Sequence, residues 1–98
     1  MAEITRHAAK RIRERQGIPK RASQKTADKA LAEGLTYEDT SGSLRRFISA
    51  LYLKRGTANN IRIYCDQVYI FHDETLITVF PLPQKYRRTV REIRRKGR

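Results

Sequence analysis

Residues 59–83, NNIRIYCDQVYIFHDETLITVFPLP, form the only long stretch of this sequence that is rich in β-branched and aromatic residues. Such side chains suit the pleated surface of a sheet, so the stretch predicts three strands, over residues 61–65, 68–72 and 75–80. Tight turns at residues 66–67 and 72–74 would join them into an antiparallel meander. Because a bare meander is marginally stable, we expect the preceding residues to cover one of its faces.

Hydrophobic spacing before the meander predicts helices over residues 3–16, 19–33 and 43–54. In the first, apolar residues recur at four-residue spacing from Ile4 to Ile12, and Gly17 is a stop signal. Pro19 is expected to open the second helix and Gly34 to follow its end.

The third predicted helix has the clearest amphipathic pattern in the chain, and we expect it to supply the main contact to the sheet. Its apolar side chains follow i, i+3, i+4, i+7 spacing: Leu44, Phe47, Ile48 and Leu51. Ser43 is its predicted N-cap. Together these patterns indicate an α+β fold, with one domain over residues 1–83 and a basic C-terminal tail or helix over residues 84–98.

The charge balance points to a polyanionic partner. Lys and Arg number 22 against 10 Asp and Glu, which gives a formal net charge of +12 and a pI near 10.6. RNA, DNA, an acidic protein or an anionic membrane surface would fit this excess. No apolar run approaches the ~20 residues of a spanning helix, and the first residues lack the apolar region of a signal peptide. We therefore expect a cytoplasmic protein without a membrane partner.

The single cysteine, Cys65, excludes an internal disulfide and falls in a strand pattern, so we expect a buried thiol in a reducing compartment. His7 and His72 are the only histidines, and no Cys/His cluster has the spacing of a metal site. The sequence also has no glycine-rich phosphate loop. We therefore expect neither a bound metal nor a cofactor, and a solvated turn residue at His72.

The first predicted helix carries a group of residues suited to phosphate chemistry. His7, Arg11 and Glu14 share one face, and Lys10 and Arg13 flank that face. The cations would attract a phosphodiester, beside which a histidine could act as an acid or a base. A solvated histidine on a basic helix is the simpler interpretation of the same spacing.

The sheet adds polar candidates. Thr78 is a lone hydroxyl in an apolar strand, where alternation predicts that Leu76, Thr78 and Phe80 share a face. Thr78 is either an ordinary strand former or a group that bonds a phosphate or a catalytic side chain. Arg62 and Tyr64 share a face of the first strand, and Tyr64 could stack on a base of RNA.

Two motifs carry a resemblance to a known group. The first is His7 followed by R-x-x-E-R-x-G, from Arg11 to Gly17, and the second is LITVFPLP at residues 76–83, with Asn59-Asn60 as a further match. Together they resemble the small bacterial and phage-borne toxin ribonucleases of the barnase–EndoU–colicin–RelE group. The resemblance covers most of residues 4–83. It implies metal-independent RNA cleavage, in which the ribose 2′-hydroxyl attacks the adjacent phosphate and leaves a 2′,3′-cyclic phosphate.

The resemblance also implies roles. His7 would be the general acid or base, Arg11 would stabilise charge on the phosphoryl oxygens, and Thr78 would orient His7 or the substrate. These roles require the three side chains to lie around one cleft. Further candidates for RNA contacts are Lys10, Lys54, Arg62, Tyr64, Arg87 and Arg88. Many members of the group end near the last strand, whereas this chain continues into its basic C-terminal residues.

Three functions remain open on the sequence. The first is a toxin-like endoribonuclease that acts on RNA without a metal. The second is a nucleic-acid-binding domain without catalysis, which the net charge alone would support. The third is a basic protein that binds an acidic partner, such as an antitoxin or immunity protein, and this function is compatible with the first.

Overall fold

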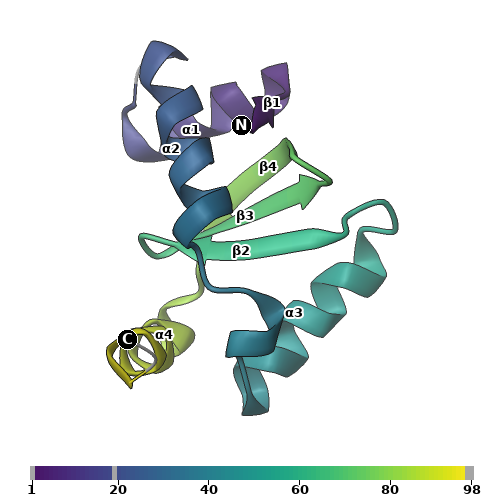
Figure 1. Cartoon of the computed structure of the whole chain (residues 1–98), viewed down its shortest axis with the longest axis vertical. Coiled ribbons are helices and arrows are strands. Elements are labelled where there is room, and N and C mark those ends of the chain that lie inside the picture. The colour runs from purple at the N-terminus through teal and green to yellow at the C-terminus, as the bar shows by residue number, and fades with distance from the viewer. Residues whose placement is uncertain (1, 19, 97–98) are drawn as a thin grey trace.

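The computed structural model describes residues 2–18 and 20–96, and within them the chain is an α+β protein with a four-stranded mixed sheet (Figure 1). The strand order across the sheet is β1-β4-β3-β2. The elements in chain order are β1 (Glu3–Ile4), α1 (Arg6–Gln16), α2 (Lys20–Glu33), the 3₁₀ helix η1 (Tyr37–Asp39), α3 (Gly42–Lys54), β2 (Asn60–Tyr64), β3 (Gln67–His72), β4 (Thr75–Pro81) and α4 (Gln84–Lys96).

The predicted antiparallel meander is present as β2, β3 and β4. Its first turn differs from the prediction, because Cys65 and Asp66 form it, with φ values of 50° and 61°. Positive φ at both central residues is typical of the type I′ turn, whose twist matches that of a hairpin. Cys65 is therefore exposed, and its predicted burial in the strand is wrong.

The prediction of a three-stranded sheet is wrong by one short strand. Glu3 and Ile4, predicted as the start of the first helix, instead pair in parallel with Thr75 and Leu76 of β4. Helix α1 begins only after Thr5, whose hydroxyl accepts a hydrogen bond from the Ala8 amide at 3.1 Å. A two-residue strand has no periodicity of its own, so its pairing depends on β4, about 70 residues away.

Most helix ends follow the sequence signals. Gly17 ends α1 as predicted, in the left-handed conformation at φ 67°, and its amide donates to the Arg13 carbonyl. Helix α2 ends at Glu33, immediately before Gly34. Its predicted opening residue, Pro19, lies outside the described residues. Helix α3 begins at Gly42 with Ser41 as its N-cap, so the predicted cap at Ser43 is wrong by half a turn.

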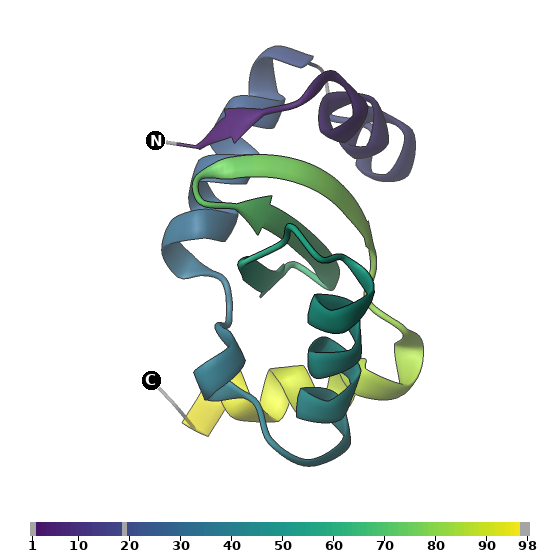
Figure 2. The ribbon, with the colours of Figure 1, turned by 90° about the vertical axis from the view of Figure 1, so that its right-hand side faces the viewer.

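The sheet is covered on both faces, with α1 and α2 packed on one side and α3 and α4 on the other (Figure 2). The α1/α2 cluster contains Ala8, Ile12, Ala27, Ala30, Tyr69, Phe71, Leu76 and Val79. The α3/α4 cluster contains Leu44, Ile48, Ile61, Ile63, Val68, Ile70, Leu82 and Val90. Alternate residues of β3 thus enter opposite clusters, as expected for a strand buried on both faces.

Residues 84–96, predicted as a basic tail or helix, form α4, while residues 97–98 lie outside the described part of the chain. Val90 is 3% exposed, and Tyr86 and Ile93 pack beside it against the α3/α4 cluster. The Tyr86 ring lies 4.9 Å from the Phe47 ring of α3, measured between centroids. This aromatic contact, together with Val90 and Ile93, holds α4 on the α3/α4 cluster.

A β-bulge in β4 changes which way its side chains point. Thr78 pairs with Ile70, whereas Leu76 pairs with Phe71, so Ile77 is an extra residue between them. Leu76 consequently lies in the α1/α2 cluster and Phe80 packs against the α3/α4 cluster. The prediction that Leu76 and Phe80 share a face is wrong, because the extra residue reverses the alternation.

Candidate active site at the edge of strand β4

His7 and Thr78 meet at the edge of the sheet. The Nε2 atom of His7 lies 3.2 Å from the Oγ1 atom of Thr78, and either atom donates according to the tautomer of the imidazole. Thr78 is buried at 5% exposure, whereas His7 is exposed. The contact therefore joins a hydroxyl with fixed surroundings to an imidazole that faces solvent, which is the arrangement needed to orient a reactive ring.

Two structural features bring these side chains together. Thr5 caps α1 and also donates its hydroxyl to the Ile77 carbonyl at 3.1 Å, so the first turn of α1 is attached to β4. The bulge at Ile77 places Thr78 opposite Ile70, on the face of the sheet that the α3/α4 cluster covers, so its contact with His7 is made at the edge of β4 and not across the α1/α2 face. Since β1 pairs with β4 only at Thr75 and Leu76, His7 approaches Thr78 along the edge that β1 leaves uncovered.

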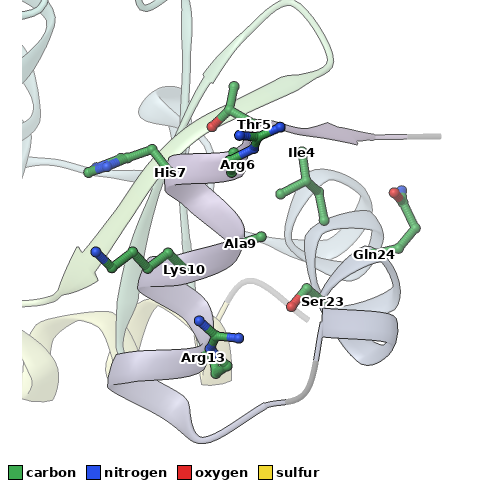
Figure 3. A pocket seen from close by; sticks show the side chains of 9 residues that line it. All are labelled: Ile4, Thr5, Arg6, His7, Ala9, Lys10, Arg13, Ser23 and Gln24. Carbon is green, nitrogen blue, oxygen red and sulfur yellow. The ribbon is translucent and has the colours of Figure 1, made fainter.

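A groove of about 810 Å³ lies beside His7, between α1 and α2 (Figure 3). In the close-up, His7 and Lys10 extend from α1 toward β4, on the side away from Ser23 and Gln24 of α2. The groove is lined by Ile4, Thr5, Arg6, His7, Ala9, Lys10, Arg13, Ser23 and Gln24. Ala9 and Ser23 are small, so the two helices leave space between them.

Three cations follow one another along this groove. Arg6, Lys10 and Arg13 stand at four- and three-residue spacing on α1, which places them in one row on the helix. All three are exposed. Among the groove-lining residues that the structure describes there is no carboxylate, so this row of cations creates a positive potential that attracts a phosphate chain.

Arg11 lies one helical turn after His7 on the same face of α1 and is half-buried. It is not among the residues that line the groove. The structure therefore brings His7 and Thr78 into contact and places Arg11 on the adjoining turn of α1.

Two of the predicted RNA-contacting residues have other partners. Arg62 donates from Nε to the Asn60 side chain at 2.9 Å and from its guanidinium to the Gly34 carbonyl at 3.4 Å. The Tyr64 ring packs edge-on against Tyr69 at 6.4 Å, with the Arg94 guanidinium 6.0 Å from its centroid. Both residues lie on β2, two strands away from β4.

The other predicted RNA contacts are divided between the two ends of the molecule. Lys10 lines the groove, but Lys54 ends α3 on the opposite face of the sheet. Arg87 and Arg88 lie on α4, where Arg87 donates to the Leu82 carbonyl at 3.3 Å and Arg88 lies 3.7 Å from Glu92. The predicted set therefore does not form one surface around His7.

Several groove residues were not among the sequence-based candidates: Thr5, Arg6, Ser23 and Gln24. Arg6 could have been found, because it extends the row of Lys10 and Arg13 by one turn. Ser23 and Gln24 carry no such signal, since only the packing of α2 against α1 brings them to the groove.

Within residues 2–18 and 20–96, no group of three or more His, Cys, Asp or Glu side chains is arranged to hold a metal ion. In the same residues, no helix has the length and apolar character needed to cross a membrane.

Comparisons with models of known protein families, with curated proteins and with solved structures found no match for this chain.

Proposed function

We propose that the protein is an endoribonuclease whose active site is the His7–Thr78 pair at the edge of β4. The observation that carries the proposal is the 3.2 Å contact between these side chains beside a cation-lined groove. A solvated histidine without a catalytic role would need neither a buried hydroxyl partner nor an adjoining row of cations. The resemblance to small toxin ribonucleases adds support, because the residues to which it assigns the acid–base and orienting roles, His7 and Thr78, are in contact.

The proposed reaction is an internal transesterification. The ribose 2′-oxygen forms a bond to phosphorus while the bond from phosphorus to the 5′-oxygen breaks, which leaves a 2′,3′-cyclic phosphate and a 5′-hydroxyl. One proton leaves the 2′-hydroxyl and one joins the 5′-oxygen, and His7 carries one of these transfers as base or acid. Thr78 holds the imidazole in the orientation that the transfer requires.

The cations of α1 have two proposed tasks. Arg11, one turn beyond His7, stabilises the negative charge that develops on the phosphoryl oxygens. Arg6, Lys10 and Arg13 bind the phosphates of neighbouring nucleotides along the groove, which supplies affinity without reading sequence. The substrate class is therefore RNA with little dependence on base sequence at these contacts.

A nucleic-acid-binding domain without catalysis is the second candidate, and the cationic row in the groove and the net charge of +12 favour it. It differs from the first in what it requires of His7. Binding by charge alone survives the loss of the imidazole, whereas cleavage does not. An acidic antitoxin or immunity protein is compatible with either candidate.

The test is cleavage of a labelled single-stranded RNA in buffer with EDTA. Wild-type protein is expected to yield fragments that end in a cyclic phosphate and begin with a 5′-hydroxyl. The same RNA with 2′-O-methyl groups is expected to stay intact, because it has no nucleophile. His7→Gln should lower the rate by about 10²- to 10⁴-fold, as expected for the loss of an acid–base group.

The matched control is His72→Gln, since His72 is also an exposed histidine but contacts the Thr57 carbonyl and not Thr78. This variant should cleave RNA at the wild-type rate. Intact RNA after incubation with wild-type protein, or equal cleavage by His7→Gln, would overturn the proposal.

A further inference from the structure

Helix α4 presents an unusual charge pattern on a firmly packed helix. Seven of its side chains are cationic: Lys85, Arg87, Arg88, Arg91, Arg94, Arg95 and Lys96. Its one carboxylate is Glu92, which pairs with Arg88. An ordinary solvated helix face mixes both signs of charge, because like charges three or four residues apart repel each other.

One face of α4 packs on the protein and the opposite face is exposed. Tyr86, Val90 and Ile93 lie against the α3/α4 cluster, so the apolar face is occupied by the protein itself. Arg88, Arg91 and Arg95 lie on the opposite, exposed face at three- and four-residue spacing. A cationic amphipathic helix can bind a bilayer only by burying its apolar face in it. Because that face is already packed on α3, the pattern favours a polyanion and not a membrane.

The position of α4 relates it to the candidate active site. β4 carries Thr78 and continues through Leu82 and Pro83 directly into α4, so one strand links the two places. Helices α1 and α4 lie toward opposite ends of the long axis of the molecule, whose Cα atoms extend over 35 Å (Figures 1 and 2). At ~3.4 Å per stacked nucleotide, a strand of about ten nucleotides would span that length.

We propose that the outer face of α4, formed by Arg88, Arg91 and Arg95, is a second phosphate-binding surface that engages the part of an RNA chain distant from the cleaved bond. The inference rests on the proposed ribonuclease activity and deepens it. The preferred substrates are RNAs longer than about ten nucleotides, which reach from His7 to α4, and not short oligonucleotides, which occupy the α1 groove alone.

The experiment compares two double variants that remove equal charge. Arg91→Gln/Arg95→Gln changes two exposed cations one turn apart on α4, and Lys25→Gln/Lys29→Gln changes two exposed cations with the same spacing on α2. Binding of fluorescein-labelled RNAs of 4 and 24 nucleotides is measured by anisotropy between 50 and 300 mM KCl. Circular dichroism of each variant verifies that the fold is retained.

For the 24-nucleotide RNA, the α4 double variant is expected to make the fall of log affinity with log salt less steep. The magnitude of the slope should decrease by about 1.4, the value for two lost phosphate contacts on a single strand. The α2 pair should leave the slope nearly unchanged, and the 4-nucleotide RNA should bind both variants alike. Equal slopes for the two pairs, or equal losses for short and long RNA, would overturn the inference. If α4 instead binds an acidic protein, the salt slopes of the α4 and α2 double variants would likewise be equal, and the inference would be overturned.

This readout is independent of catalysis. If wild-type protein leaves RNA intact but the α4 pair alone weakens binding of the long RNA, the ribonuclease proposal fails and the second surface stands. If RNA is cleaved but both pairs behave alike, the ribonuclease proposal stands and α4 has no part in substrate binding.

Discussion

The imidazole of His7 and the hydroxyl of Thr78 are in contact although 71 residues separate them in the chain. Helix α1 supplies the first and the last strand supplies the second, and the Thr5 hydroxyl attaches these two elements at the Ile77 carbonyl. The proposed chemistry depends on this attachment, because a displaced imidazole would lose its contact with Thr78.

Thr78→Val removes the hydroxyl and keeps the size and branching of the buried side chain. We expect RNA cleavage to fall by about 10- to 100-fold, because a loosely oriented imidazole spends less time in the reactive geometry. Thr78→Ser retains the hydroxyl and should retain most of the activity. The measurement is the initial cleavage rate, and a fully active Thr78→Val variant would show that the contact has no role in the reaction.

Thr5→Ala removes both the N-cap of α1 and the bond to Ile77. Loss of a threonine cap costs about 1 kcal/mol of unfolding free energy, which urea denaturation would measure. Cleavage should fall more than the stability loss explains, since His7 lies two residues beyond the cap. Thr5→Ser can make the same two bonds and serves as the control. Unchanged stability in Thr5→Ala would contradict the capping role.

Gly34→Ala tests the close packing of α2 on β2. An added Cβ would lie 2.5 Å from the Ala30 carbonyl oxygen and 2.9 Å from the Arg62 Cβ, so the backbone must shift. We expect a loss of about 1–3 kcal/mol of unfolding free energy. At Gly56 an added Cβ meets nothing within 4 Å, and Gly56→Ala should change stability by less than about 0.5 kcal/mol. Equal effects of the two substitutions would argue against this packing.

Tyr69→Phe is expected to change the response to alkaline pH. Burial raises the pKa of Tyr69 above 10.0, and the hydrogen bond with Gln16 acts more weakly in the opposite direction. Well below pH 10 the phenol is neutral in both folded and unfolded chains. There the unfolding free energy of wild type should exceed that of the variant by about 1 kcal/mol, because only wild type forms the hydrogen bond with Gln16.

As the pH rises above 10, the unfolded phenol ionises first, so the contribution of Tyr69 to stability is lost as the pH passes through the folded-state pKa. The difference between wild type and Tyr69→Phe should therefore shrink in urea titrations between pH 9 and pH 11. A difference that stays constant over this range would show that Tyr69 does not titrate differently in the folded chain.

The local elements of this protein follow from the sequence alone. The β-branched and aromatic residues of 59–83 predict three antiparallel strands, and Gly17 and Gly34 mark where two helices end. These features depend on side-chain periodicity and on the φ angle of single residues, which neighbouring residues determine. The same holds for the row of cations on α1, because helical spacing places them on one side.

Tertiary structure decided the remainder. The pairing of Glu3 and Ile4 with β4, the bulge that redirects Thr78 and the groove between α1 and α2 each involve residues far apart in the chain. The packing of α4 depends in the same way on Phe47 of α3. None of these contacts leaves a local pattern in the sequence, since each forms only when several surfaces are buried together. The basic composition follows from the sequence, whereas its division between the α1 groove and the outer face of α4 follows from the fold.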